Sequence, residues 1–188
     1  MKLNHIACAL IISVVILAVA GCVAQEKAAT GSTLQVPDKS LLPAGFRLIA
    51  VETPSTQGVN MTDEIRDFYG AKSIGTVEDS IVGRYWWGKP GIDYDAKITI
   101  IQLKDKSSAE NAVSNYVSQP DFKNPPLKGW ARFSSAIING HNTTEIRKGV
   151  NDQSIRYLYL WNNNNLVVLA EGNNTRSVSL EFASSTGL

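Results

Sequence analysis

The stretch IRYLYLWNNNNLVVLA, residues 155–170, decides the fold class of this chain. Two apolar runs, Ile155–Trp161 and Leu166–Ala170, flank four consecutive asparagines. Asparagine tolerates the left-handed backbone that a tight turn between antiparallel strands requires. The stretch therefore predicts a β-hairpin.

The first run of this hairpin alternates aromatic residues with leucines. Successive side chains of a strand point to opposite faces of the sheet, so Tyr157, Tyr159 and Trp161 share one face while Leu158 and Leu160 share the other. A strand that is apolar on both faces is typical of the centre of a sheet covered on both sides.

Five earlier segments are also predicted to form strands. They are Phe46–Val51, Ser80–Trp87, Lys97–Leu103, Ala131–Ile138 and Thr143–Lys148. The second and third are expected to pair as a hairpin, and Asn139-Gly140 is a turn signal between the last two.

Three segments have helical features. The first follows a cap at Asn60 or Thr62 and ends at Gly70, the second is Ser107–Ser118 with Ser107 and Glu110 at capping-box spacing, and the third is Thr175–Ser185, which also shows strand-like alternation.

The order of these elements predicts an α+β fold with an antiparallel sheet, because the consecutive strands are joined by short connections. We expect the helices to pack mainly on one face of the sheet. Residues 80–118 and 143–185 share a strand-strand-helix layout, which suggests a pseudo-repeat, although their residues scarcely match.

The N-terminal segment reads as a signal peptide. Lys2 supplies the positive charge and Ile6–Ala20 the apolar region. Val19-Ala20-Gly21-Cys22 resembles the lipobox of secreted lipoproteins, in which the cysteine receives the lipid and becomes the new N-terminus. The alternative is an uncleaved anchor, because the apolar run extended to Ala24 is just long enough to cross a bilayer.

This interpretation divides the chain into residues 1–21 as the signal peptide, 22–40 as a flexible tether and 41–188 as one globular domain. Cys8 would be removed with the signal peptide, leaving Cys22 as the only thiol and no intrachain disulfide. The tether is polar and rich in small residues, and it is long enough to hold the domain clear of a membrane.

Composition limits the classes of function. Of the 188 residues, 44% are hydrophobic and 18 basic residues face 17 acidic ones. Removing Lys2 with the signal peptide makes the numbers equal, so nothing favours nucleic-acid binding. The apolar content is that of a folded domain.

Few residues offer catalytic or metal-binding chemistry. His141 would be the single histidine of the mature chain, and with Cys22 lipidated no set of zinc ligands or catalytic triad is evident. We therefore expect no enzyme activity, metal or cofactor. The alternative is chemistry by acidic residues near helix starts and turns, which are Asp63, Glu64, Asp67, Glu78, Asp79, Asp93 and Asp95. They would act as glycosidase carboxylates, or Asp93 and Asp95 would form a weak calcium site.

Aromatic residues give the candidate binding surface. Trp86 and Trp87 are adjacent in a predicted strand, so one of them would be exposed on a sheet covered on one side only. Such a side chain can stack on a sugar or anchor a protein partner. Packing of both in the core is the simpler explanation. If they share a face with Tyr157, Tyr159 and Trp161, the two sets form one binding surface.

Three asparagines, Asn60, Asn142 and Asn173, begin glycosylation sequons. About two are expected by chance at this composition, so the number is weak evidence. Asn142 and Asn173 lie near turn signals and are the better candidates.

Several stretches resemble surface lipoproteins of methanogenic archaea. These are residues 60–65 (NMTDEI), 68–71 (FYGA), 157–163 (YLYLWNN) and 180–183 (LEFA). The resemblance implies a lipid-anchored location on the extracytoplasmic face of the cell membrane and carries over no catalytic residue. The sequons agree with such a glycosylated surface.

The leading hypothesis is therefore a non-catalytic, lipid-anchored domain that binds a partner protein or a small ligand at the cell surface. A cell-envelope glycan hydrolase that uses carboxylates is one alternative, and an accessory structural subunit of a membrane complex is another.

Overall fold

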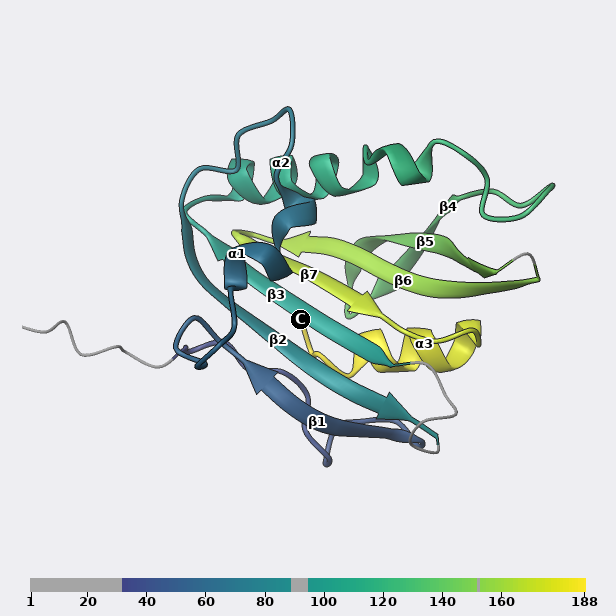
Figure 1. Ribbon diagram of the computed structural model, residues 1–188, viewed down its shortest axis with the longest axis horizontal. Helices are drawn as coiled ribbons and strands as arrows, with labels where there is room; N and C mark the ends of the chain where they lie inside the picture. Colours follow the sequence, from purple (N-terminus) through teal and green to yellow (C-terminus); the bar gives the residue numbers. More distant parts are fainter. Residues whose placement is uncertain (1–31, 89–94, 152) are drawn as a thin grey trace, which may run out of the picture.

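The computed structural model describes residues 32–88, 95–151 and 153–188 (Figure 1). The signal peptide, the lipobox with Cys22, and Asp93 lie outside the described residues. The elements in chain order are β1 (Phe46–Glu52), α1 (Met61–Glu64), the 3-10 turn η1 (Arg66–Phe68), β2 (Val77–Trp87), β3 (Ala96–Leu103), α2 (Lys106–Val117), the 3-10 turn η2 (Pro120–Phe122), β4 (Phe133–Ile138), β5 (His141–Asn151), β6 (Ser154–Asn163), β7 (Leu166–Glu171) and α3 (Arg176–Ser184).

The strands form one seven-stranded sheet in the order β1-β2-β3-β7-β6-β5-β4, with every neighbouring pair antiparallel. The predicted α+β class and the antiparallel sheet are thus confirmed. β6 and β7 form the expected hairpin, and its asparagine turn places Asn164 at φ 52°. Asn139 (φ 49°) and Gly140 (φ 85°) likewise make the turn between β4 and β5.

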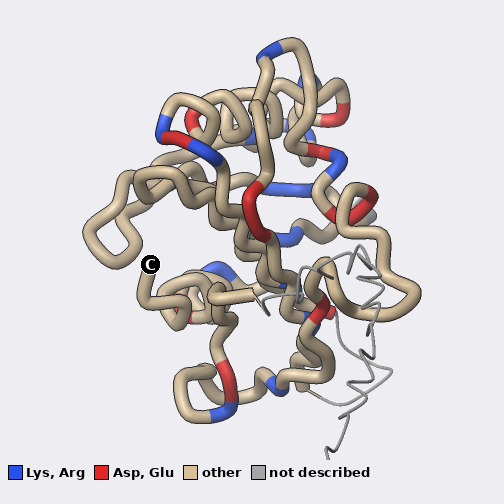
Figure 2. Tube along the Cα trace, turned by 90° about the vertical axis from the view of Figure 1, so that its left-hand side faces the viewer, with Lys and Arg blue, Asp and Glu red and all other residues tan. Residues whose placement is uncertain are grey.

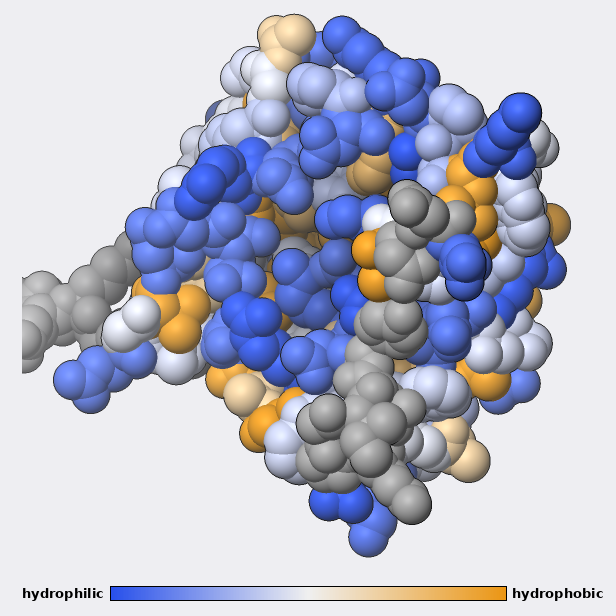
Figure 3. All heavy atoms as spheres, turned by 45° about the vertical axis from the view of Figure 1, so that its right-hand side comes forward, coloured by the Kyte–Doolittle hydropathy of each residue, from blue (hydrophilic) through white to orange (hydrophobic). Residues whose placement is uncertain are grey.

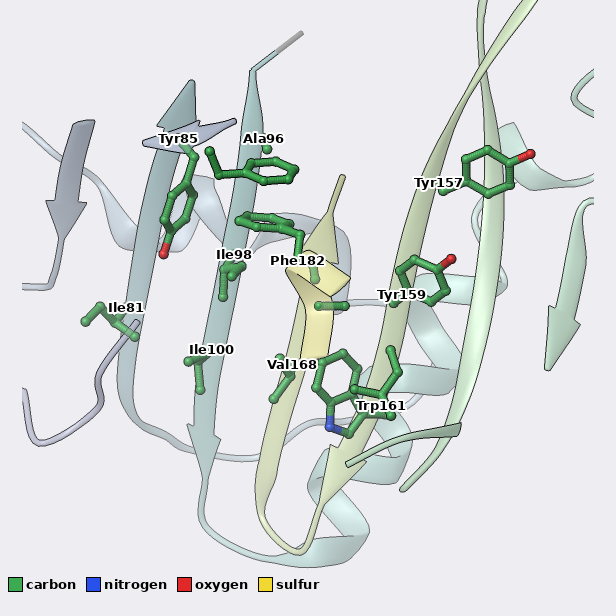
Figure 4. Packing of buried hydrophobic residues seen from close by; sticks show 14 of the residues in the cluster. Ile81, Tyr85, Ala96, Ile98, Ile100, Tyr157, Tyr159, Trp161, Val168 and Phe182 are labelled. Carbon is green, nitrogen blue, oxygen red and sulfur yellow. The ribbon is translucent and has the colours of Figure 1, made fainter. Parts of the chain in front are cut away.

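Each face of the sheet carries its own apolar cluster. On the face that packs against α3, here called the α3 face, the cluster includes Tyr85, Tyr157, Tyr159 and Trp161 (Figure 4). On the opposite face, here called the α2 face, aliphatic strand residues pack against α2. They are Ile101, Leu103, Ile146, Leu158, Leu160, Val167 and Leu169. The central strands are therefore buried on both sides, as the alternation in β6 predicted.

The expectation that the helices pack mainly on one face is not confirmed. α2 and η1 cover one face through Tyr116 and Phe68, whereas α3 covers the other through Phe182. The central strands have apolar side chains on both faces, and each face needs a covering layer. The pseudo-repeat is not confirmed either. A rotation relating the two segments would exchange the antiparallel neighbours β3 and β7 and would place α2 and α3 on the same face. The two helices lie on opposite faces.

Residues 32–40, assigned to the flexible tether, pack against the domain. Leu34 and Val36 contact the α3-face cluster, and the Tyr85 hydroxyl donates a 3.0 Å hydrogen bond to the carbonyl of Pro37. Ser32 donates a hydrogen bond to Asp79. The packed part of the chain therefore includes these residues, because alternate apolar side chains in this segment find a place on the α3 face.

The helices differ from the prediction in their caps and lengths. Asn60 caps α1 as expected, but the segment is one short helix followed by η1. α2 is capped by Asp105, whose carboxylate accepts a 2.8 Å hydrogen bond from the amide of Ser108. The predicted capping box at Ser107 is therefore wrong by two positions. Among the described residues, no helix is long and apolar enough to cross a membrane.

Candidate functional site

The adjacent tryptophans at the end of β2 point to opposite faces of the sheet. Trp87 packs with the α3-face cluster, and its ring centre lies 6.4 Å from that of Phe46. Trp86 lies opposite Arg47 of β1 and lines a pocket on the α2 face. The two residues therefore do not share a surface.

The pocket lies on the α2 face toward the end where β2 finishes and β3 begins, away from the cluster that α2 covers. Its volume is about 300 Å³, at the lower end of the range for small-molecule sites, which is about 300–1,000 Å³. The polar and aromatic side chains that line it are Arg84, Trp86, Asp95, Lys97, Arg156 and Glu171. Ile49 and Ala50 add apolar surface, and Tyr85 and Ala96, whose side chains belong to the α3-face cluster, also border the pocket.

Three charged residues of this pocket are in register across three strands. Arg84 of β2 is opposite Lys97 of β3, and Lys97 is opposite Glu171 of β7. The Lys97 ammonium lies 3.0 Å from a carboxylate oxygen of Glu171. The sheet register thus builds a row of basic, basic and acidic side chains along one side of the pocket.

Arg84 is held by two carboxylates from different elements. Its Nε lies 2.7 Å from Glu52 of β1, and its Nη2 lies 2.9 Å from Glu64 of α1. The hydrogen bond to Glu52 and the nearby charge of Glu64 raise the pKa of the guanidinium above its ordinary value. Like charges directly opposite in a sheet repel, so these carboxylates offset the repulsion between Arg84 and Lys97.

The remaining aromatic candidates belong to the core. Tyr159 and Trp161 are fully buried, and Tyr157 is 8% exposed. Figure 4 shows the three in a row along β6, on the same side of the sheet as Phe182 of α3. The condition for one binding surface with Trp86 is therefore not met, because these three residues point to the other face, which α3 and residues 32–40 cover.

A buried carboxylate on β5 is a polar centre that sequence reasoning missed. Glu145 is fully buried and lies 2.8 Å from Arg147 and 2.7 Å from Arg176 of α3. Ser134 and the Tyr159 hydroxyl also donate hydrogen bonds to it. The pKa of Tyr159 is raised, mainly by burial and next by the charge of Glu145. The alternation of Glu145 with Arg147 was the available sequence signal, and it resembled that of an exposed strand face.

The sequon asparagines differ in accessibility. Asn60 and Asn142 are exposed, and both remain candidates for glycosylation. Asn173 is fully buried, and its side-chain oxygen accepts a 2.8 Å hydrogen bond from the amide of Thr175 ahead of α3. Asn173 is therefore not accessible to a glycan in the folded domain, and the turn signal near it was misleading.

The acidic residues considered for catalysis or metal binding are mostly engaged in local contacts. Asp63 pairs with Arg66 at 2.7 Å, and Glu64 pairs with Arg84. Asp95 lines the Trp86 pocket. In the described part of the chain, no three or more His, Cys, Asp or Glu residues are arranged to hold a metal ion. His141 begins β5 and is partly exposed.

Charges of both signs are spread over the domain. Figure 2 shows acidic and basic residues interspersed along the described chain, as the nearly equal totals of 18 basic and 17 acidic residues suggest. On the side presented in Figure 3, hydrophilic residues predominate and apolar residues lie in small groups between them. At the Trp86 pocket, an aromatic ring and several charged groups converge.

No protein-family model matches the sequence, and no curated protein matches it. Among solved structures, the extracellular domain of PknH from Mycobacterium tuberculosis is similar to this chain with a TM-score of 0.45 and 10% sequence identity. The alignment covers 79% of this chain and 91% of that domain. Both the TM-score and the identity are too low to support a functional assignment.

Proposed function

We propose that this protein is a lipid-anchored, extracytoplasmic, non-catalytic domain that binds a small ligand in the pocket at Trp86. The observation that carries the proposal is the pocket itself, where an indole and five charged side chains converge on the α2 face. Binding pockets commonly combine apolar or aromatic surface with a few placed polar groups.

The anchor rests on the leader and the lipobox at Cys22. Replacing Cys22 with Ser removes the thiol to which the lipid is attached, so we expect the protein to move from the membrane fraction to the medium. The test is immunoblotting of cell fractions. The matched control is Cys8→Ser, which alters the other thiol within the signal peptide and should leave the protein at the membrane. Retention of the Cys22 variant at the membrane would favour an uncleaved anchor.

Binding is favoured over catalysis because three carboxylates at the pocket are held in ion pairs. Glu171 lies against Lys97, and Glu52 and Glu64 lie against Arg84. A carboxylate in an ion pair has part of its hydrogen-bonding capacity taken by the cation, which leaves less of it for a substrate. Hydrolysis of glycosides that is lost on replacing Glu171 with Gln would contradict the non-catalytic part of this proposal.

The binding function is tested with the full chain in a detergent without a sugar headgroup. The protein is incubated with the low-molecular-mass fraction of cell-envelope extract and examined by native mass spectrometry. We expect a bound species that is absent with Trp86→Ala and present with Trp130→Ala, which alters an exposed tryptophan outside the pocket. Equal retention, or no retention, by the wild type and the Trp86 variant would contradict the proposal.

A further inference from the structure

The charges around the Trp86 pocket largely neutralise one another. Arg84, Lys97 and Arg156 are the cations that line it, and Asp95 and Glu171 are the acids. Glu52 and Glu64 add two carboxylates that hold Arg84 at 2.7 and 2.9 Å. A ligand with a full charge would compete with these pairs, and separating a partly buried ion pair is costly. The pocket is therefore better suited to a neutral ligand.

The same groups supply hydrogen bonds of both kinds. Lys97 and the arginines offer N–H donors, whereas the carboxylate of Glu171 is an acceptor. In the row Arg84, Lys97, Glu171 these groups stand on neighbouring strands, in register. A hydroxyl both donates and accepts, so a ligand with adjacent hydroxyls can bond to such a row without displacing its ion pairs.

Trp86 adds a flat, polarisable surface to this polar row. It is partly exposed and lines the pocket together with Ile49 and Ala50. A pyranose ring has hydroxyls around its rim and C–H groups on its faces, so it can stack on an indole while its hydroxyls reach charged side chains. The volume of about 300 Å³ suits a ligand of this size.

We infer that the pocket binds a neutral sugar unit, stacked on Trp86 and hydrogen-bonded by Arg84, Lys97 and Glu171. This inference rests on the proposed binding function and specifies its ligand class. The ion pairs stay in place on binding, and the sugar hydroxyls take the hydrogen-bonding capacity that the pairs leave.

The test is isothermal titration calorimetry of the full chain, in a detergent without a sugar headgroup, with glucose, galactose, mannose and N-acetylglucosamine. We expect saturable binding of at least one sugar, and a loss of affinity of about tenfold or more in Trp86→Ala. Trp86→Phe keeps an aromatic surface and should retain most of the affinity, and Trp130→Ala should match the wild type. Circular dichroism and thermal unfolding show that each variant is folded.

Charged probes separate failure of this inference from failure of the proposed function. Inorganic phosphate, acetate and glycine are titrated in the same way, and the sugar titration is repeated at about 50 and 500 mM salt. A neutral ligand should bind with nearly unchanged affinity across this range. Binding of phosphate, acetate or glycine that depends on Trp86, with no binding of sugars, would overturn the sugar assignment and support the pocket. Absence of sugar binding together with no Trp86-dependent species in the extract experiment would overturn both.

Discussion

The two faces of the sheet are built from the same strands but differ in what lies on them. The α3 face is an aromatic layer closed by α3 and by residues 32–40, with Tyr159 and Trp161 fully buried. The α2 face is aliphatic where α2 covers it and charged at the end that contains Trp86. Alternation along the same strands thus places a buried aromatic layer on one face and a pocket lined by charged side chains on the other.

The charged groups on the two faces also differ in how deeply they are buried. On the α3 face, Glu145 is fully buried between Arg147 and Arg176 and is bonded by Tyr159. On the α2 face, the pair of Lys97 and Glu171 is partly exposed to the pocket. Breaking the contacts of a fully buried charge is more destabilising than breaking a pair that keeps some contact with water. Glu145 and its arginines should therefore contribute more to the stability of the domain, and Lys97 with Glu171 should mainly set the charge of the pocket.

The largest expected effect is the loss of aromatic volume from the α3 face. Replacing Trp161 with Ala should lower the free energy of unfolding by about 4 kcal/mol, because a large and fully buried ring is removed. Urea denaturation followed by circular dichroism measures this change. Trp130→Ala, at an exposed position, should change the value by less than about 0.5 kcal/mol. Equal effects of the two changes would contradict the assignment of Trp161 to the core.

Removing the buried carboxylate of the α3 face should also cost more stability than removing the pocket carboxylate of the α2 face. Glu145→Gln keeps the shape of the side chain but leaves the largely buried Arg147 without its counter-charge and removes the charged acceptor of the Ser134 and Tyr159 hydroxyls, and we expect a loss of about 3 kcal/mol. Glu171→Gln should cost about 1 kcal/mol or less, because Lys97 retains contact with water. The same denaturation experiment checks both. A larger cost at Glu171 would show that the pocket pair is the structural one.

Alkaline pH should weaken the α3 face. Burial raises the pKa of Tyr85 and of Tyr159. The stability that these neutral phenols contribute is fully present below about pH 10, the ordinary pKa of tyrosine, and is lost as the pH rises above it. Urea denaturation from pH 8 to pH 11 should show this decline.

Replacing Tyr85 with Phe provides the control. The variant loses the hydrogen bond to the Pro37 carbonyl and should be less stable by about 1 kcal/mol at pH 8. Its free energy of unfolding should fall less steeply above pH 10 than that of the wild type, because one titrating tyrosine is gone. Parallel curves for the two proteins would exclude Tyr85 as a source of the alkaline loss.

A smaller effect is expected at the start of α2. Asp105→Ala removes the carboxylate that accepts from the Ser108 amide, and it should lower the melting temperature by roughly a few degrees. Ser107→Ala should leave the melting temperature nearly unchanged. The bond from Ser108 also lowers the pKa of Asp105, so this stabilisation is present above about pH 4 and is lost as the pH falls below it. A larger decrease in melting temperature for Ser107→Ala than for Asp105→Ala would favour the capping box predicted at Ser107.

Local patterns predicted the strands and turns well. The alternation in Ile155–Trp161 and the asparagine turn that follows it led to a buried hairpin, and the structure contains it. Strand periodicity also placed Trp86 and Trp87 on opposite faces. These features depend on residues that are close in sequence, so one sequence is enough to find them.

Long-range features were not predicted. Glu145 is paired with Arg176, 31 positions away, and residues 32–40 pack on the α3 face through contacts such as that between Pro37 and Tyr85. Which tryptophan lines a pocket depends on which face of the sheet the helices leave open at that end. These contacts join residues that are far apart in sequence, so strand periodicity cannot predict them.

The most direct test of the account measures binding and stability in parallel for Trp86→Ala and Trp87→Ala. Trp86→Ala should lower sugar affinity in calorimetry by about tenfold or more while the free energy of unfolding stays within about 1 kcal/mol of the wild type. Trp87→Ala should lower that free energy by about 2 kcal/mol, because its ring packs with Phe46 and the α3-face cluster, and should leave sugar affinity unchanged wherever the protein is folded. If the two variants lose binding equally, or if the Trp86 variant is the less stable one, the division of roles between the two faces is wrong.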